Sequence, residues 1–223
     1  MAVALIVAAG RGERLGTGRP KALVKVAGRP MLQWSVDALE SVAAVTEVIV
    51  ALPADALDAA PRGVRAVAGG AVRSASVAAA LEAVQGPGDE PVIVHDAARP
   101  LVTPGIFEDA LIELERSGAD AVVAAAPVTD TVKQVARGSL RVERTLDRGR
   151  LWAVQTPQVF RRAALESRLA GASAEVLEQA TDDAWLIEQG GGAVVILPAP
   201  ADNMKITTPH DLHVAELILG RRA

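Results

Sequence analysis

Cysteine is absent from this 223-residue sequence, and aromatic side chains account for only 2% of it. Without cysteine, disulfide bonds, thiolate nucleophiles and cysteine-ligated zinc sites are excluded. With so few aromatics, alanine, valine and leucine must fill the core. A basic excess is also missing: the net charge is −4, so we expect no nucleic-acid partner. This balance still allows a local basic pocket for a phosphorylated ligand.

Long hydrophobic runs are missing as well. The apolar stretch at residues 2–9 is too short to cross a bilayer. It also lacks the preceding basic residues of a signal peptide, so we expect no membrane segment and a cytoplasmic location. Half of the residues are hydrophobic and 22% are charged, which is a globular composition. The length favours a single domain over residues 1–223.

Apolar runs alternate with amphipathic stretches along the chain. The pattern predicts strands over residues 2–9, 47–52, 64–68, 91–95 and 120–126. It predicts helices over residues 31–42 and 74–84, between Thr103 and Gly118, and from Pro209 onward. Such alternation is typical of βαβ units, so we expect an α/β fold with a mainly parallel sheet. Ligands of these sheets bind beyond the carboxyl ends of the strands, where candidate site residues should lie.

One segment departs from this alternation. Residues 131–146 read as two short strands around the turn Arg137-Gly138-Ser139. The segment carries many charges and little apolar surface, and an isolated two-stranded hairpin is marginally stable. We therefore expect a protruding β-arm, at about residues 127–150, that packs on another surface such as a second subunit.

A glycine-rich segment, residues 8–12, follows the first predicted strand, with Arg14 and Lys21 beyond it. Backbone N–H groups of such a turn can cradle phosphates. The glycine spacing fits neither a P-loop nor the dinucleotide fingerprint G-x-G-x-x-G. Composition alone leaves two interpretations open: an anion-binding loop, or a tight turn flanked by solvated basic residues.

A second polar cluster, His95 to Pro100, follows the predicted strand at 91–95. Asp96 could hold a divalent cation, and Arg99 could hold a phosphate through its two-pronged guanidinium. The alternative is an Asp–Arg ion pair that orders a loop. Arg148 and Lys205 come late in the chain, and each by itself reads as a surface charge.

Two further kinds of site are disfavoured. His210 and His213 are three residues apart on the predicted C-terminal helix, but a catalytic zinc site needs a third ligand. We therefore expect these histidines to lie on a solvated face. The G-x-S-x-G motif of serine hydrolases is absent.

These motifs, taken in order, resemble those of the 2-C-methyl-D-erythritol 4-phosphate cytidylyltransferase family over nearly the whole chain. The first motif marks only the broad nucleotidyltransferase class, whereas the string His-Asp-Ala-Ala-Arg-Pro is more specific. The motifs that carry the resemblance are residues 8–14, Pro20-Lys21, Gly69-Gly70 with Arg73 and Ser76, residues 95–100, 126–133, Asp147-Arg148, 156–158, 181–184 and 202–205.

The resemblance implies a fold and a reaction. The fold would be a single three-layer Rossmann-like nucleotidyltransferase domain with a mainly parallel sheet and a protruding β-hairpin arm. The reaction would join CTP to a polyol phosphate, 2-C-methyl-D-erythritol 4-phosphate, in isoprenoid precursor synthesis by the non-mevalonate pathway. The family further implies Mg²⁺, held largely by the triphosphate, and a homodimer built through the arm.

The resemblance also implies site residues. Arg14 and Lys21 would stabilise the transition state at the α-phosphate, and Arg148 and Lys205 would hold the acceptor phosphate. Asp96 would lie near the metal. The implied nucleotide-binding residues are Ala8, Ala9, Gly10, Gly12, Gly70, Arg73, Ser76 and Asp96. The implied acceptor-binding residues are Asp96, Arg99, Thr131, Arg148, Thr181 and Lys205.

Two other functions stay open on the sequence. Ribitol 5-phosphate cytidylyltransferases share the fold, the nucleotide and similar motifs, and would differ in a few hydroxyl contacts. A non-catalytic relative would be expected to lose the four catalytic charges, which are all present here. The chain departs from the family's usual residues at Glu13, Ala22 and Ala71, and none of these removes a catalytic charge.

Overall fold

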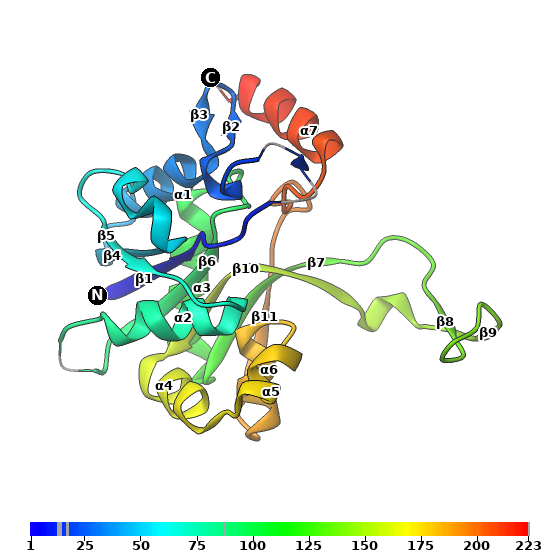
Figure 1. The fold of residues 1–223 in the computed structure, drawn as a ribbon. Helices are drawn as coiled ribbons and strands as arrows, with labels where there is room; N and C mark the ends of the chain where they lie inside the picture. Colours follow the sequence, from blue (N-terminus) through cyan, green and yellow to red (C-terminus); the bar gives the residue numbers. More distant parts are fainter. Residues whose placement is uncertain (13–14, 17, 87, 223) are drawn as a thin grey trace.

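The computed structural model describes residues 1–12, 15–16, 18–86 and 88–222 and has a seven-stranded sheet at its centre (Figure 1). The strand order is β11-β7-β10-β6-β1-β4-β5. All neighbours are parallel except β10, which runs antiparallel to both β6 and β7. The strands are β1 (Ala2–Val7), β4 (Val45–Leu52), β5 (Arg65–Ala68), β6 (Pro91–Asp96), β7 (Ala121–Pro127), β10 (Trp152–Arg161) and β11 (Val194–Pro198).

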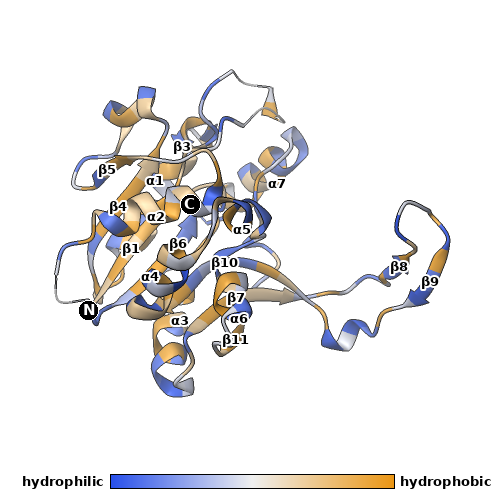
Figure 2. Cartoon of the chain, turned by 60° about the horizontal axis from the view of Figure 1, so that its bottom comes forward, coloured by the Kyte–Doolittle hydropathy of each residue, from blue (hydrophilic) through white to orange (hydrophobic). Residues whose placement is uncertain are grey.

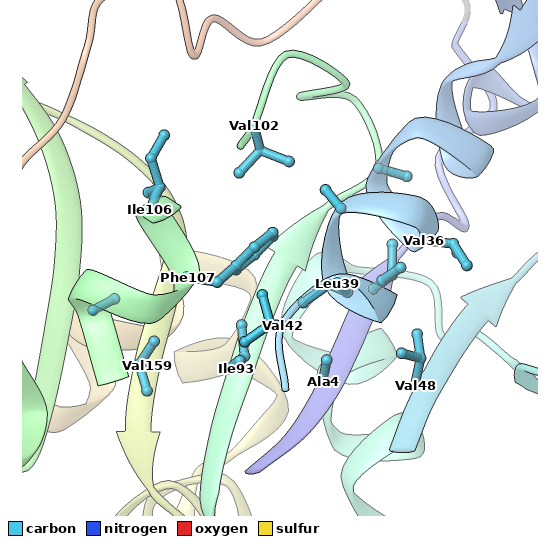
Figure 3. Close-up of a cluster of buried hydrophobic side chains, with 14 of the residues drawn as sticks. Ala4, Val36, Leu39, Val42, Val48, Ile93, Val102, Ile106, Phe107 and Val159 are labelled. Atoms are coloured by element: carbon cyan, nitrogen blue, oxygen red, sulfur yellow. The ribbon is translucent and has the colours of Figure 1, made fainter. Parts of the chain in front are cut away.

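Helices cover both faces of this sheet, which makes the three layers expected from the sequence. On one face, α1 (Met31–Glu40) and α3 (Pro104–Ser117) pack around Phe107 in a cluster shown in Figure 3. On the other face lie α2 (Arg73–Glu82), α4 (Arg162–Gly171) and α6 (Asp183–Gln189). Successive residues of β1 point to opposite clusters, Ala4 to the first and Leu5 to the second. The core is built mostly of alanine, valine, leucine and isoleucine, as the scarcity of aromatics predicts.

Both predicted ends of one helix and the predicted start of another are confirmed. Helix α3 begins after Thr103 and ends at Gly118, whose φ of +67° is the left-handed conformation that glycine adopts without strain. Helix α7 (Pro209–Gly220) begins with a capping box, in which Thr208 and Asp211 each accept a hydrogen bond from the other's backbone N–H.

Strand β10 is the main element that the sequence pattern does not predict. It lies in the middle of the sheet, yet it contains Pro157 and the buried polar residues Gln155, Thr156 and Gln158. Its pairing with β7 is interrupted between Val154 and Gln158. A central strand usually has a continuous run of apolar residues, and the polar residues of β10 interrupt that pattern.

Smaller elements surround the sheet. The hairpin of β2 (Lys25–Val26) and β3 (Arg29–Pro30) packs with α7 around a separate apolar cluster that includes Met31 and Ile206. The remaining short helices are η2 (Lys21–Leu23), η3 (Ala54–Ala59), η4 (Arg148–Arg150) and α5 (Ala174–Gln179). Among the described residues, no helix is both long and apolar enough to cross a membrane.

The predicted β-arm is present between β7 and β10. Its strands β8 (Lys133–Val135) and β9 (Val142–Thr145) form an antiparallel hairpin that extends away from the rest of the chain (Figure 1). Every residue of both strands is exposed. The side chain of Leu140 at the tip is 92% exposed, and Figure 2 shows further apolar stretches on the arm.

Candidate active site

A pocket of about 950 Å³ opens at the carboxyl ends of β1, β4 and β6. This is the edge of a parallel sheet at which ligands of α/β folds bind. The pocket is lined by residues 7–12, 53–55, 69–73 and 96–98, together with Lys21, Ala22, Ser76, Lys205 and Thr207. Its walls therefore combine two glycine-containing loops with several charged side chains.

The first of these loops, residues 8–12, is packed against Lys21. The backbone N–H of Lys21 donates to the carbonyl of Gly10 over 3.0 Å. Gly12 has a φ of +70°, and a Cβ there would lie 2.8 Å from the Cβ of Lys21. Only glycine fits both requirements, so the loop brings the Lys21 backbone closer than a side chain would allow. This close approach holds Lys21 in the wall of the pocket.

The second loop, at Gly69 and Gly70, approaches the first just as closely. A Cβ on Gly69 would lie 2.4 Å from the Cβ of Ala9. Ser76 stabilises the loop from below: its buried hydroxyl accepts from the Gly70 N–H at 3.1 Å and lies 3.2 Å from the Val72 carbonyl, to which it can donate. The hydroxyl of Ser76 thus shapes the loop as well as lying at the pocket wall.

Charged side chains from distant parts of the chain meet at the base of the pocket. Lys205 Nζ donates to Asp96 Oδ2 over 2.6 Å. Arg73 Nε donates to the other oxygen, Asp96 Oδ1, over 3.0 Å. Arg73 Nη1 in turn donates to Asp183 Oδ2. We call these four residues the charge cluster; it contains two cations and two carboxylates.

Burial and pairing shift the pKa values in the charge cluster. Burial alone would raise the pKa of Asp96, but the charges of Arg73 and Lys205 outweigh it and hold that pKa well below the ordinary range. Burial alone would lower the pKa of Arg73, but Asp183 and Asp96 raise it above its ordinary value. Asp96 and Arg73 are therefore both ionised near neutral pH.

Buried hydrogen bonds hold the segment that carries Lys205. The Asn203 amide donates to Gln155 Oε1 and to the Thr156 carbonyl, both over 2.8 Å. The carbonyl of Asn203 accepts from Arg99 Nη1 over 2.7 Å. A buried strand, β10, and a buried arginine thus fix the backbone two residues before Lys205.

A second chain of hydrogen bonds holds Asp96 from behind. The N–H of Asp96 donates to Thr156 Oγ1 over 3.0 Å, and this hydroxyl lies 3.0 Å from His95 Nδ1. The hydroxyl of Thr156 can accept from Asp96 and still either donate to His95 Nδ1 or accept from it, according to the tautomer of the ring. Burial lowers the pKa of His95 to about 3, so the ring stays uncharged.

The structure brings most of the sequence-predicted residues together. Residues that line the pocket are Ala8, Ala9, Gly10, Gly12, Lys21, Gly70, Arg73, Ser76, Asp96 and Lys205. Arg99 lies just behind it, buried, with its guanidinium on the carbonyls of Asn203 and Val154. Thr181 is exposed before α6 and does not line the pocket. Arg14 lies outside the described residues.

Thr131 and Arg148 lie on the arm, apart from the pocket of their own chain. Both side chains are exposed, and Arg148 Nη1 donates to the carbonyl of Thr129 over 2.7 Å. Neither residue lines the pocket. The predicted acceptor-binding roles of Thr131, Arg148, Arg99 and Thr181 remain predictions.

Sequence reasoning missed one member of the charge cluster and the residues behind it. Asp183 belongs to the motif at 181–184, but the motif alone gave it no role. Gln155 and Asn203 also lie in recognised motifs or next to them, and their contacts depend on strand β10. The sequence showed only that these polar residues lie in or beside the motifs. It did not show which of them contact one another in the folded chain.

The described residues offer little for a metal by themselves. They contain no group of three or more His, Cys, Asp or Glu side chains that could hold a metal ion. Asp96 presents one carboxylate to the pocket, and each of its oxygens already contacts a cation. A single carboxylate fits Mg²⁺ only where substrate phosphates and water supply the other ligands, which is a usual arrangement for this ion.

Comparisons with known proteins identify the family of this chain. The family model described as 2-C-methyl-D-erythritol 4-phosphate cytidylyltransferase matches residues 2–221. A protein of that name from Streptomyces avermitilis is 45% identical, over 98% of this chain and 92% of its own length. One from Saccharopolyspora erythraea is 44% identical, over 98% and 99%. The crystal structure of a protein of the same name from Thermus thermophilus has a TM-score of 0.79 and 35% identity, covering 97% of this chain and 98% of its own.

Proposed function

Because this chain belongs to the 2-C-methyl-D-erythritol 4-phosphate cytidylyltransferase family, we propose that it transfers the cytidylyl group of CTP to that acceptor. The products are 4-diphosphocytidyl-2-C-methyl-D-erythritol and pyrophosphate, a step of isoprenoid precursor synthesis. The observation that carries the proposal is the family match over residues 2–221, joined to a pocket that both Lys21 and Lys205 line. CTP is made and kept inside cells, which supports the expected cytoplasmic location.

The reaction exchanges one phosphoanhydride bond for another. An oxygen of the acceptor phosphate forms a bond to the α-phosphorus of CTP, and the bond from that phosphorus to the bridging oxygen breaks. Pyrophosphate leaves with the electron pair. Both reactants are anions, so catalysis consists mainly of holding them together and neutralising the charge that gathers around the α-phosphate.

The described side chains divide this work. Lys21, which the glycine loop holds at the pocket, would neutralise the α-phosphate, and the family resemblance adds Arg14, which lies outside the described residues. Lys205 would receive the acceptor phosphate, and its contact with Asp96, which uses one of the three donors of an ammonium, supports this role. Mg²⁺, bound by the triphosphate beside Asp96, would neutralise the phosphates further.

The arm completes the proposal. We infer a homodimer in which the arm of one subunit brings Thr131 and Arg148 to the partner's pocket. Two observations support it: both residues lie away from their own pocket, and the arm exposes Val135, Leu140 and Val142. Apolar side chains on a protruding hairpin are usually covered by a partner surface.

The first experiment measures pyrophosphate release with Mg²⁺ and CTP, with either 2-C-methyl-D-erythritol 4-phosphate or ribitol 5-phosphate as acceptor. Release with the first acceptor alone is the expected result. Release only with ribitol 5-phosphate would keep the nucleotidyl transfer and replace the acceptor. No release with either acceptor would overturn the proposed activity.

The dimer is tested by light scattering on the intact protein and on a variant without residues 131–146. The intact protein should have twice the mass of one chain, and the deletion variant the mass of one chain. Equal subunit numbers for the two proteins would show that the arm does not build the dimer.

A further inference from the structure

The guanidinium of Arg73 is shared between two carboxylates that come from different segments. Its Nε contacts Asp96 at the end of β6, and its Nη1 contacts Asp183 at the start of α6. The second oxygen of Asp96 accepts from Lys205. Each oxygen of Asp96 therefore has its own cation, and Arg73 offers Asp96 only one of its donors in the described contacts.

Asp183 is the member of the charge cluster that is buried without satisfying all of its hydrogen bonds. Its side chain is completely buried, and its Oδ1 has no hydrogen-bond partner among the described residues. Burial raises the pKa of Asp183 despite the opposing charge of Arg73, so keeping a carboxylate at this position has a cost in stability. Helix α6 does not need Asp183 as its cap, since Asp182 accepts from the N–H of Trp185 over 2.9 Å.

The geometry of arginine suggests what Asp183 does. An arginine beside a single carboxylate tends to donate to both of its oxygens. If Arg73 did so, through the Nε and Nη2 donors that Arg116 uses on Glu113, it would compete with Lys205 for Asp96 Oδ2. Asp183 holds the opposite edge of the guanidinium through Nη1, which fixes Arg73 in an orientation where Nε alone contacts Asp96, at Oδ1, while Lys205 contacts Oδ2.

We infer that Asp183 is a positioning residue for the transfer reaction: by holding Arg73, it keeps one oxygen of Asp96 for Lys205 and fixes the ammonium that receives the acceptor phosphate. The inference rests on the proposed function for the identity of the anion. The arrangement of the four side chains does not depend on it.

Asp183→Asn is the variant that tests this role, because it keeps the shape of the side chain and removes the carboxyl group that pairs with Arg73. We expect the KM for the acceptor to rise at least about tenfold, and the KM for CTP to change less than about threefold. Equal changes in both values, or no change in either, would overturn the inference.

Glu90→Gln is the matched control. Arg162 is also shared between two carboxylates, with Nη1 at 2.5 Å from Glu90 and Nε at 2.6 Å from Glu166. Neither of these carboxylates lines the pocket. Loss of one carboxylate from this pair should lower the melting temperature without a selective change in the acceptor KM. If Glu90→Gln also changes the acceptor KM selectively, a selective change in that KM cannot be taken as evidence that Asp183 positions Lys205.

A double-variant comparison separates positioning from general loosening of the fold. In a Lys205→Ala background there is no ammonium to position, so Asp183→Asn should leave the acceptor KM unchanged within about twofold. If the effects of the two substitutions on the acceptor KM instead multiply, Asp183 acts independently of Lys205 and the inference is wrong.

A crystal structure of Asp183→Asn tests the arrangement without any assay. Arg73 should donate to both oxygens of Asp96, and Lys205 Nζ should lie beyond contact distance of that carboxylate. An unchanged Asp96–Lys205 contact would overturn the inference even if the enzyme assay supports the proposed function. If wild-type protein is inactive, the proposed function fails, and this structure still decides the role of Asp183.

If Asp183→Asn does not fold, Asp183→Ser replaces it. A serine hydroxyl is smaller and uncharged, so it fits the buried position without holding Arg73 Nη1 as the carboxylate does. The acceptor KM should again rise more than the CTP KM. An unchanged ratio of the two KM values would overturn the inference.

Discussion

Lys205 Nζ lies 2.6 Å from Asp96 Oδ2, although 109 positions separate the two residues in the sequence. The contact joins the end of a central strand to the segment that leads into the last helix. It keeps a cation at the pocket before any anion binds, and it keeps the buried Asp96 carboxylate neutralised. Loss of Asp96 would remove the carboxylate that Lys205 contacts, and loss of Lys205 would leave Asp96 with Arg73 alone.

Lys21→Ala should lower kcat at least about a hundredfold, because it removes a preorganised positive charge at the α-phosphate. The measurement is pyrophosphate release at saturating CTP and acceptor. Lys25→Ala is the control: Lys25 is nearby, exposed and absent from the pocket lining. A folded Lys21→Ala protein with wild-type kcat would remove Lys21 from the catalytic residues.

Gly12→Ala should also impair the reaction. The added methyl group would lie 2.8 Å from the Cβ of Lys21, at a φ of +70°. Displacement of Lys21 should lower kcat/KM about a hundredfold. The backbone strain should lower the free energy of unfolding by about 1–2 kcal/mol, as measured by urea denaturation.

Gly105→Ala is the matched control for Gly12. Gly105 lies in the first turn of α3, and no atom lies within 4 Å of the position of an added Cβ. This substitution should stabilise the protein by up to about 1 kcal/mol and leave the kinetics unchanged. If both alanine variants lose the same activity, close packing of Gly12 on Lys21 is not the cause.

Mixed dimers should show whether Arg148 serves its own pocket or the partner's. Lys21→Ala and Arg148→Ala should each be nearly inactive alone. Co-expression of the two should return about a quarter of wild-type activity, because half of the dimers are mixed and each of these has one intact site. If Arg148 serves its own subunit, every site in the mixture has one defect and activity stays low.

The cap of α7 should make stability depend on pH. Burial alone would raise the pKa of Asp211, but the N–H groups of Thr207 and Thr208, each 2.8 Å from Oδ2, lower it below its ordinary value. A carboxyl group with a lowered pKa in the folded state stabilises above its unfolded pKa, about 3.9, and loses this effect as the pH falls through the folded value.

Wild-type protein should therefore be more stable than Asp211→Asn at pH 6, by roughly 0.5 kcal/mol. This difference should disappear as the pH is lowered below about 4. Urea denaturation of both proteins between pH 6 and pH 3 measures it. A difference that stays constant over this range would mean that the charge of Asp211 contributes nothing.

Local patterns in the sequence predicted much of the fold. The run at residues 2–9 became β1, and Thr103 with Gly118 marked the ends of α3, because these signals depend only on neighbouring residues. The hairpin at 131–146 was also predicted, from its alternation and its turn. Strand β10 was not, since its buried polar residues are satisfied by partners far away in the sequence.

The candidate site divides in the same way. The sequence by itself determined which residues could bind anions: the loop at 8–12, Lys21, Asp96 and Lys205 belong to motifs that can be read in order. Only the tertiary structure decided that Arg73 joins Asp96 to Asp183 and that Arg99 is buried behind the pocket. The physical reason is that ion pairs and buried hydrogen bonds depend on distance in space, which the packing of strands and helices sets and local sequence does not contain.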